Sequence, residues 1–311
     1  MTAQAQARVI VVTGPTASGK SALALALAER RNGVVINADA MQTYDAFPIL
    51  TAQPSAVERA RAPHVLYGLL PLSETLSAAR WRTLAEVEIG RAHAEGCIPI
   101  LCGGSGLYLR TLMQGIAPIP DAPAELRQQA NVDWQTMGAD AFRARLAEKD
   151  PTIVGRLKPG DRQRHVRAWE VWRATGRPLS TWQAVEAKPA PWRFTSLLLA
   201  PERGWLRDRI ERRFDAMLAE GVLAEARAVF DGNPDPQWPG LKAHGAPELF
   251  RHFRGELSLA DARRIAIDHT RQYAKRQMTW FRHQMAPDLV LDPEADPGLT
   301  AAEKYLDNSG V

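Results

Sequence analysis

Residues 9–21 of the chain read Val-Ile-Val-Val-Thr-Gly-Pro-Thr-Ala-Ser-Gly-Lys-Ser. The last eight, from Gly14 to Ser21, match the phosphate-loop pattern GxxxxGK[ST]. The glycines let such a loop fold into a ring of inward-pointing amides, Lys20 can reach terminal phosphates, and the Ser21 hydroxyl can bind Mg²⁺. The apolar run before the loop and the Ala/Leu-rich helical run after it supply the strand–loop–helix context that a chance match would lack. The stretch therefore predicts a phosphate site, although its amides suit a nucleotide, a kinase donor or an alkyl diphosphate alike.

Short β-like runs alternate with helical stretches over residues 8–116, at Val9–Val12, Val34–Asn37 and Ile98–Cys102. This alternation is typical of a parallel sheet covered by helices. A Pro-rich turn at 117–123 breaks it, and residues 124–188 read as helices rich in arginine and tryptophan. A second Pro-rich joint, at 188–192, precedes another β-like run, Phe194–Leu199, where the chain rejoins the sheet.

We therefore predict an α/β fold with a P-loop NTPase-like parallel sheet core and an inserted all-helical domain. The core would comprise residues 1–120 and 190–311, and the insertion residues 121–189. Long amphipathic helices are expected at 206–230 and 259–285, and a polar, poorly ordered tail after Asp288.

The composition argues against several classes of protein. The 311 residues are 45% hydrophobic and 24% charged, enough for one large core or two smaller ones. Cys97 and Cys102 have no second pair, which argues against a zinc site or a disulfide framework and favours a reducing cytoplasm. No apolar run approaches about 18 residues, so we expect neither a membrane span nor a signal peptide. No exposed apolar seam suggests a partner, so a monomer is the expectation.

Asp39 follows the second β-like run, where an open parallel sheet presents its ligands beside the phosphate loop. The carboxylate could cap a helix or bind a Mg²⁺ water, or it could act as a general base. Its neighbours Met41, Gln42 and Tyr44 offer amide and aromatic surface of the kind that reads a nucleobase edge.

A second glycine loop, Gly103-Gly-Ser-Gly106, follows the third β-like run. On its own it could simply turn a strand into a helix. Beside a phosphate loop we expect it to line the same cleft, with the Ser105 hydroxyl as a polar contact.

Residues 155–182 are strongly basic, with seven Arg or Lys against Asp161 and Glu170, a local charge of +5. Trp169, Trp172 and Trp182 are interleaved among them. We expect Trp169 and Trp172 to be mostly core, whereas the arginine excess suits an RNA backbone. Further arginines recur at 207–213 and in the segment 271–282, where they could close over a diphosphate or flank RNA, although several will be plain surface residues.

With these motifs in this order, the chain resembles the tRNA dimethylallyltransferases over essentially all of residues 8–285. The motifs that carry the resemblance are GPTASGKS (14–21), INADAMQTY (36–44), GGSGLYLR (103–110), DRQRHVRAWEVWRATGR (161–177) and RQYAKRQMTWFR (271–282). The resemblance implies transfer of a dimethylallyl group from dimethylallyl diphosphate to the exocyclic amine of the adenosine just 3′ of the anticodon, in tRNAs that read codons beginning with U. ATP would not be consumed.

The resemblance also implies roles for individual residues. Asp39 would be the base, and Thr16 would contact the bridging oxygen of the leaving diphosphate. Mg²⁺ would be the cofactor, bound at Ser21, and the partner would be the anticodon stem-loop of tRNA. The diphosphate contacts would be Gly14, Pro15, Thr16, Ala17, Ser18, Gly19, Lys20, Ser21, Arg209 and Arg213. The tRNA contacts would be Asp39, Ala40, Met41, Gln42, Ser105, Arg127, Gln163, Arg164, His165, Val166 and Arg167.

Three positions depart from the pattern of that family. Ala40 replaces a usual serine, Ser105 replaces a threonine, and Gln53 stands where a basic residue is common. The first two leave the base and the loop hydroxyl in place, and Gln53 puts one charge contact in question. The segment 242–247 aligns only loosely and contributes no predicted site residue.

Other activities are compatible with a phosphate loop. One is a prenyltransferase that acts on free adenine nucleotides, but a mononucleotide offers no surface for the helical insertion to bind. A kinase of this size usually carries a short lid instead of such an insertion. A non-catalytic RNA-binding protein would not need Asp39 or the second glycine loop.

Overall fold

The computed structural model describes residues 7–294 and 298–310. They form a six-stranded sheet in the order β3-β2-β4-β1-β5-β6, with every pairing parallel. The strands are β1 (Arg8–Thr13), β2 (Gly33–Asn37), β3 (His64–Val65), β4 (Ile98–Gly103), β5 (Arg193–Leu199) and β6 (Leu289–Leu291). The α/β class and the parallel sheet predicted from the alternation are confirmed.

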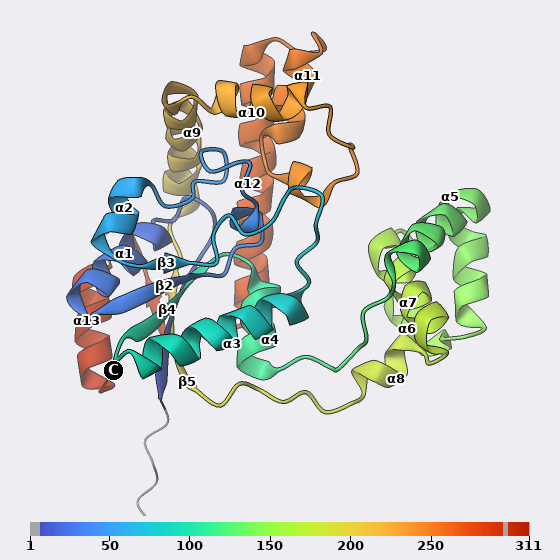
Figure 1. The fold of residues 1–311 in the computed structure, drawn as a ribbon, viewed down its shortest axis with the longest axis horizontal. Coiled ribbons are helices and arrows are strands. Elements are labelled where there is room, and N and C mark those ends of the chain that lie inside the picture. The colour runs from blue at the N-terminus through green and yellow to red at the C-terminus, as the bar shows by residue number, and fades with distance from the viewer. Residues whose placement is uncertain (1–6, 295–297, 311) are drawn as a thin grey trace, which may run out of the picture. The chain divides into compact units, whose positions relative to one another are not determined.

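Successive side chains of β1 point to opposite faces of the sheet, and both faces are covered (Figure 1). Ile10 and Val12 pack with α1 (Lys20–Arg30) and α13 (Leu299–Asn308). Val9 and Val11 share a larger core with α3 (Ala78–Ala94), α4 (Gly106–Gln114) and later helices. Burial on both faces explains why this strand reads as a continuous apolar run.

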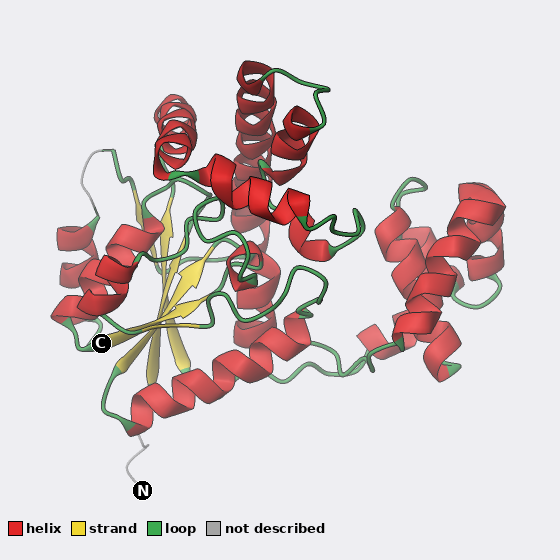
Figure 2. Ribbon diagram, turned by 45° about the horizontal axis from the view of Figure 1, so that its top comes forward, coloured by secondary structure: helices red, strands yellow, loops and turns green. Residues whose placement is uncertain are grey.

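Figure 2 shows the helices of the sheet unit packed around its sheet. The remaining helices of this unit follow β2 and β5 along the chain. They are η1 (Met41–Thr43), α2 (Ala56–Arg61), α9 (Arg203–Glu220), α10 (Val222–Asp231), η2 (Pro239–Lys242), α11 (Ala246–Phe253) and α12 (Leu259–Gln284). The single helix expected over 206–230 is wrong: Gly221, with φ +103°, separates α9 from α10.

The expectation of a poorly ordered tail is also wrong for the residues that the structure describes. Leu289–Leu291 pair with β5, and Leu306 of α13 is fully buried against the sheet. The sequence there is polar overall, but Leu291, Ala302 and Leu306 fall at core positions. Residues 295–297 and 311 of that tail, like residues 1–6, lie outside the described part.

The chain divides into two compact units, Met1–Met113 with Ala190–Val311, and Gln114–Pro189. The second unit consists of α5 (Ala124–Ala147), α6 (Pro151–Arg156), α7 (Arg162–Thr175) and α8 (Leu179–Gln183). Its core is aromatic: Phe142 packs edge-on to both Trp134 and Trp169. Asp150, itself buried, caps α6 by accepting from the Ile153 amide and also accepts from the Ser180 amide. Trp169 is buried and Trp172 partly so, as the sequence predicted.

Candidate active site

The phosphate loop connects β1 to α1, and its shape depends on two glycines. Gly14 and Gly19 have φ values of +154° and +93°, and a side chain at Gly14 would place its Cβ 2.7 Å from the Leu199 carbonyl oxygen. Lys20 opens α1 and is only 8% exposed, with its Nζ 3.4 Å from the Pro15 carbonyl. Burial lowers the Lys20 pKa, and the nearby Asp39 carboxylate partly opposes this effect. A diphosphate here would supply counter-charge for this buried ammonium.

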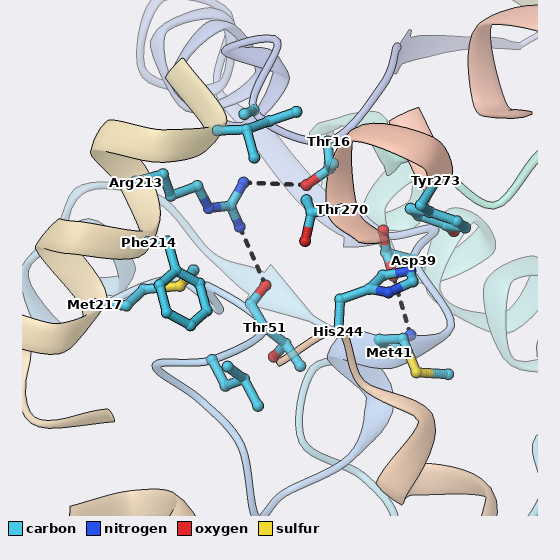
Figure 3. A pocket seen from close by; sticks show the side chains of 13 residues that line it. Thr16, Asp39, Met41, Thr51, Arg213, Phe214, Met217, His244, Thr270 and Tyr273 are labelled. Carbon is cyan, nitrogen blue, oxygen red and sulfur yellow. Dashed lines mark hydrogen bonds between the residues drawn. The ribbon is translucent and has the colours of Figure 1, made fainter. Parts of the chain in front are cut away.

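Two arginines of α9 reach the phosphate loop. Arg209 donates from Nε to the Ala17 carbonyl at 3.2 Å and stacks on Trp205. Arg213 donates to the Thr16 hydroxyl at 3.4 Å and to the Thr51 carbonyl at 3.5 Å (Figure 3). Burial lowers the pKa of Arg213, chiefly by desolvation, with Asp39 acting in the opposite sense. The structure therefore gathers these predicted diphosphate contacts, from segments about 190 residues apart, around one loop.

Asp39 stands just after the carboxyl end of β2. The Asn37 side chain holds this turn by accepting from the Asp39 amide (2.8 Å) and donating to the Asp39 carbonyl (3.0 Å). One carboxylate oxygen accepts from the Met41 amide at 3.0 Å. Asp39, Met41, Thr16 and Arg213 all line one pocket, which brings the predicted base beside the predicted diphosphate contacts.

The second glycine loop lies against the Asp39 turn. Ser105 accepts from the Ala40 amide through Oγ (2.9 Å), and its own amide donates to the Ala38 carbonyl. Gly103 must lack a side chain, because its Cβ would fall 2.1 Å from the Ala38 carbonyl carbon. The role of Ser105 that the structure displays is to brace the Asp39 segment, with its hydroxyl oxygen committed as an acceptor.

An aromatic and apolar wall faces Asp39 in the same pocket (Figure 3). The His244 ring lies 4.5 Å from the Tyr273 ring, centroid to centroid. Burial lowers the pKa of His244, with Arg276 as the next contribution, so the imidazole is neutral at physiological pH. The other lining residues are Ala17, Leu50, Thr51, Ile210, Phe214, Met217 and Thr270. The pocket thus combines the guanidinium of Arg213 and the carboxylate of Asp39 with flat aromatic and apolar surface.

The comparisons with known proteins agree with this geometry. The sequence model described as IPP transferase matches residues 42–284. The chain belongs to the IPP transferase family. It is 51% identical over 287 residues to the tRNA dimethylallyltransferase of Rhodospirillum centenum, covering 92% of this chain and 91% of that protein. Its identity to the enzyme of that name from Granulibacter bethesdensis is 49% over 278 residues, covering 89% and 87%.

Solved structures of this family have the same fold. The tRNA isopentenylpyrophosphate transferase of Bacillus halodurans is 30% identical, with a TM-score of 0.70 and coverage of 97% of this chain and 96% of that one. A eukaryotic dimethylallyltransferase described as acting on tRNA is 26% identical, with a TM-score of 0.82, covering 96% and 78%. The family assigned from the five motifs is therefore confirmed.

The remaining predicted residues of this IPP transferase family member lie in the helical unit, on α5 and α7. Gln163 and Arg164 are exposed, whereas His165 and Val166 are buried in the core of that unit. Arg127 and Arg167 both face Glu170, at 4.0 and 3.3 Å. Of the segment 163–167, only the first two side chains are fully available to a partner, because one face of α7 must pack against α5.

Two side chains near Asp39 in the sequence, Gln42 and Tyr44, are largely buried. Tyr44 is buried and donates its hydroxyl to the Glu74 carbonyl. Gln42 is 9% exposed, and its amide nitrogen donates to the Thr51 and Ala52 carbonyls. Tyr44 belongs to the core, so the expectation that its side chain reads a nucleobase edge is wrong, whereas the tRNA contact expected of Gln42 stays a prediction. Gln53, which stands where a basic residue is common, donates to the Tyr44 carbonyl at 2.6 Å, so its side chain makes a contact within the protein.

His244, Thr270, Tyr273 and Gln277 were not among the predicted site residues. Thr270, Tyr273 and Gln277 recur at helical spacing in α12, so they share one face, and the last two belong to the quoted segment 271–282. That periodicity could have singled them out. His244 lies in the loosely aligned segment 242–247, and nothing in the sequence placed it beside Asp39.

The residues present fit a Mg²⁺ ion that arrives with its phosphates. Ser21 is exposed at the first turn of α1, next to Lys20, and offers a hard oxygen ligand. Within residues 7–294 and 298–310, no group of three or more His, Cys, Asp or Glu could form a protein-built metal cage. Mg²⁺ commonly takes one or two protein ligands plus phosphate oxygens, which this donor set allows. None of the described helices is long and apolar enough to span a bilayer.

Proposed function

We propose that this protein transfers a dimethylallyl group from dimethylallyl diphosphate to the N6 amine of the adenosine 3′-adjacent to the anticodon in tRNAs that read UNN codons. The products are N6-isopentenyladenosine and diphosphate. Membership of the IPP transferase family and about 50% identity to tRNA dimethylallyltransferases support the reaction class. The observation that carries the proposal is the pocket in which Asp39 shares walls with Thr16 and Arg213, beside the phosphate loop.

The reaction needs a good leaving group, because the lone pair of the adenine amine is delocalised into the ring. As the allylic carbon–oxygen bond breaks, negative charge grows on the diphosphate and positive charge on the allyl group. Lys20, Arg209, Arg213 and the loop amides stabilise the diphosphate charge, and Thr16 donates to its bridging oxygen. Mg²⁺ bound at Ser21 would add to that stabilisation. The new bond joins the amine nitrogen to the allylic carbon, and the amine proton passes to Asp39.

The pocket's other wall suits the two organic groups. His244 and Tyr273 present ring faces against which the adenine can stack, and Met217, Phe214 and Leu50 can shield the allyl chain from water. The adenosine must leave the anticodon-loop stack at a cost of a few kcal/mol, which contacts to the RNA backbone can offset. We assign those contacts to the helical unit, through exposed side chains such as Arg164 and Gln163. We expect the enzyme to act as a monomer in the cytoplasm.

The test is transfer of label from radiolabelled dimethylallyl diphosphate, with Mg²⁺, into unmodified tRNA that reads a UNN codon. Digestion of the product to nucleosides and mass spectrometry locate the label. We expect a single isopentenyladenosine next to the anticodon and none in a tRNA whose acceptor is replaced by guanosine. Label entering free AMP or ATP instead would mean that mononucleotides are the acceptors. Phosphorylation of a small acceptor with ATP would support a kinase.

A further inference from the structure

Gln277 is a polar side chain at a core position of α12. It is 5% exposed and lies on the same buried stripe of the helix as Ala274 and Phe281. Its Oε1 accepts from the Thr16 amide at 2.8 Å, and its Nε2 donates to the Gly104 carbonyl at 3.0 Å. One partner is an obligate donor and the other an obligate acceptor, so the amide orientation is fixed.

The second glycine loop is shaped to let α12 come this close. A Cβ on Gly104 would lie 2.2 Å from Gln277 Nε2 and 3.3 Å from the Gly14 carbonyl oxygen. One turn further along the helix, Trp280 packs on Gly106, where a Cβ would lie 2.3 Å from the indole ring. The helix, the phosphate loop and the second glycine loop therefore converge at Gln277, and no larger residue fits at Gly104 without moving the amide.

The hydrogen bond to Thr16 determines what that residue can do. Amides of a phosphate loop commonly point at the bound anion, but the Thr16 amide is taken by Gln277. This orients the peptide so that the Thr16 side chain lies within 3.4 Å of Arg213 in the pocket. Through the Gly104 carbonyl, the same side chain holds the loop whose Ser105 braces Ala40, next to Asp39.

We propose that Gln277 is a positioning residue that fixes the phosphate loop against the second glycine loop and so sets Thr16 relative to Asp39. Its effect on the loop does not depend on the reaction, whereas its effect on turnover rests on the proposed function. Gln277 touches neither reacting group in this account. A displacement of about 1 Å at reacting atoms can cost on the order of 100-fold in rate, which makes such a residue measurable.

The experiment compares Gln277→Met, which keeps the length of the side chain and loses both hydrogen bonds, with the wild type. The matched control is Gln284→Met, the same change at an exposed position of α12 where the amide contacts Arg110. Calorimetry with Mg²⁺ and inorganic pyrophosphate measures the phosphate loop without any transfer. We expect about 10-fold weaker pyrophosphate binding and a 10- to 100-fold lower kcat for Gln277→Met, with KM for tRNA within about 2-fold. The control should match the wild type.

The outcomes separate this inference from the proposed function. Pyrophosphate binding within about 2-fold of wild type in a folded Gln277→Met protein overturns the positioning role. Wild type that binds pyrophosphate but transfers nothing overturns the proposed function and leaves the loop measurement to decide on Gln277.

Gln277→Glu is the second variant, and it tests the positioning role of Gln277 if Gln277→Met does not fold. A protonated carboxyl can still donate to the Gly104 carbonyl and accept from the Thr16 amide, whereas an ionised one cannot donate. Pyrophosphate affinity relative to wild type should therefore fall as pH rises and the carboxyl ionises. A Gln277→Glu protein whose new carboxyl ionises between pH 5 and 9, as followed by infrared spectroscopy, yet binds pyrophosphate as tightly as wild type throughout that range contradicts the inference.

Discussion

The buried ammonium of Lys20 lowers the free energy of unfolding of the ligand-free protein. The ammonium is buried, and its pKa is lowered mainly because it is removed from water. The unfolded chain therefore binds this proton more tightly than the folded protein does. The wild type therefore gains stability as pH rises from the lowered pKa toward 10.5, because the buried ammonium loses its charge over that range.

We predict that Lys20→Met raises the free energy of unfolding of the ligand-free protein by about 1–2 kcal/mol at pH 7. The same change should weaken pyrophosphate binding at least ~10-fold, because the cation is lost. Urea unfolding at pH 7 and pH 10 measures the first effect, which should shrink at the higher pH. Lys304→Met, at an exposed position of α13, is the control. A Lys20→Met protein that is less stable than wild type would show that the buried ammonium is not a cost to the fold.

His244 supplies a test in acid. Its pKa is lowered from 6.5 by burial and by Arg276, while Glu248 and Asp39 act in the opposite sense and His269 adds a small lowering. Since the folded state disfavours the proton, stability from this group is full above pH 6.5 and is lost as pH falls through the lowered pKa.

We therefore predict that the difference in unfolding free energy between wild type and His244→Gln is constant above pH 6.5. Below pH 6.5 the unfolding free energy of the wild type should fall relative to that of the variant. Urea unfolding at pH 5 to 8 measures it, with the exposed His283→Gln as the comparison. A difference that is the same at every pH would show that the imidazole is not held neutral.

The helices α9 and α12 are joined by ion pairs that flank Arg213 on either side. Arg263 of α12 contacts Asp215 at 2.6 Å and Glu211 at 3.0 Å, and Arg271 contacts Glu211 at 3.1 Å. These side chains are partly exposed, so each pair adds little to stability. Because Glu211 contacts both arginines, the pairs nevertheless fix α9, which carries Arg209 and Arg213, relative to α12, which carries Tyr273.

For Arg263→Gln we predict a loss of about 0.5–1 kcal/mol in unfolding free energy, less in 1 M salt, because solvent and ions screen the pairs. Pyrophosphate affinity should fall about 2- to 5-fold, since Arg213 is held less firmly. Arg264→Gln, which removes an i,i+3 pair with Asp261 on the same helix, should leave that affinity unchanged. Equal effects of the two changes would mean that the bridge between the helices has no role.

The strands illustrate how far sequence patterns reach. β1, β2, β4 and β5 were predicted to within one residue at either end, because strands that are buried on both faces of a parallel sheet read as short, nearly continuous apolar runs. The break at Gly221 was missed because the apolar stripe continues across it, from Phe214 and Met217 to Val222 and Ala226. β6 is only three residues long, and its pairing with β5 depends on tertiary contact.

The site could be predicted where one loop or one strand end carries it. The phosphate loop and Asp39 are such cases, since both depend on a short local sequence motif at the carboxyl edge of a parallel sheet. The wall formed by His244 and Tyr273 depends on how α12 and the segment before α11 pack, which no local pattern encodes. His165 was predicted as a contact although the aromatic core of the helical unit buries it.

For the molecule as a whole, we expect the sheet unit to bind the diphosphate and the helical unit to bind the RNA backbone. Arg164 of the helical unit has a side chain that is 73% exposed, beside Asp161. Arg164→Ala should weaken tRNA binding and reduce the salt dependence of log Kd by about 1, because one phosphate contact is lost. Pyrophosphate binding should not change.

Filter binding of tRNA at several salt concentrations, with calorimetry for pyrophosphate, measures both quantities. Arg30→Ala, which removes an ion pair between α1 and Glu303 of α13 in the sheet unit, is the comparison. If Arg164→Ala leaves tRNA affinity and its salt dependence unchanged, the helical unit binds RNA elsewhere.

We propose that Asp39 accepts the amine proton beside a diphosphate held by the phosphate loop. The most direct measurement is the single-turnover rate of dimethylallyl transfer to tRNA for wild type and Asp39→Asn, with both substrates saturating. We predict a rate at least ~100-fold lower for the variant, with the affinities for pyrophosphate and tRNA within a few-fold of wild type. A variant that transfers at the wild-type rate would contradict the assignment of Asp39 as the base.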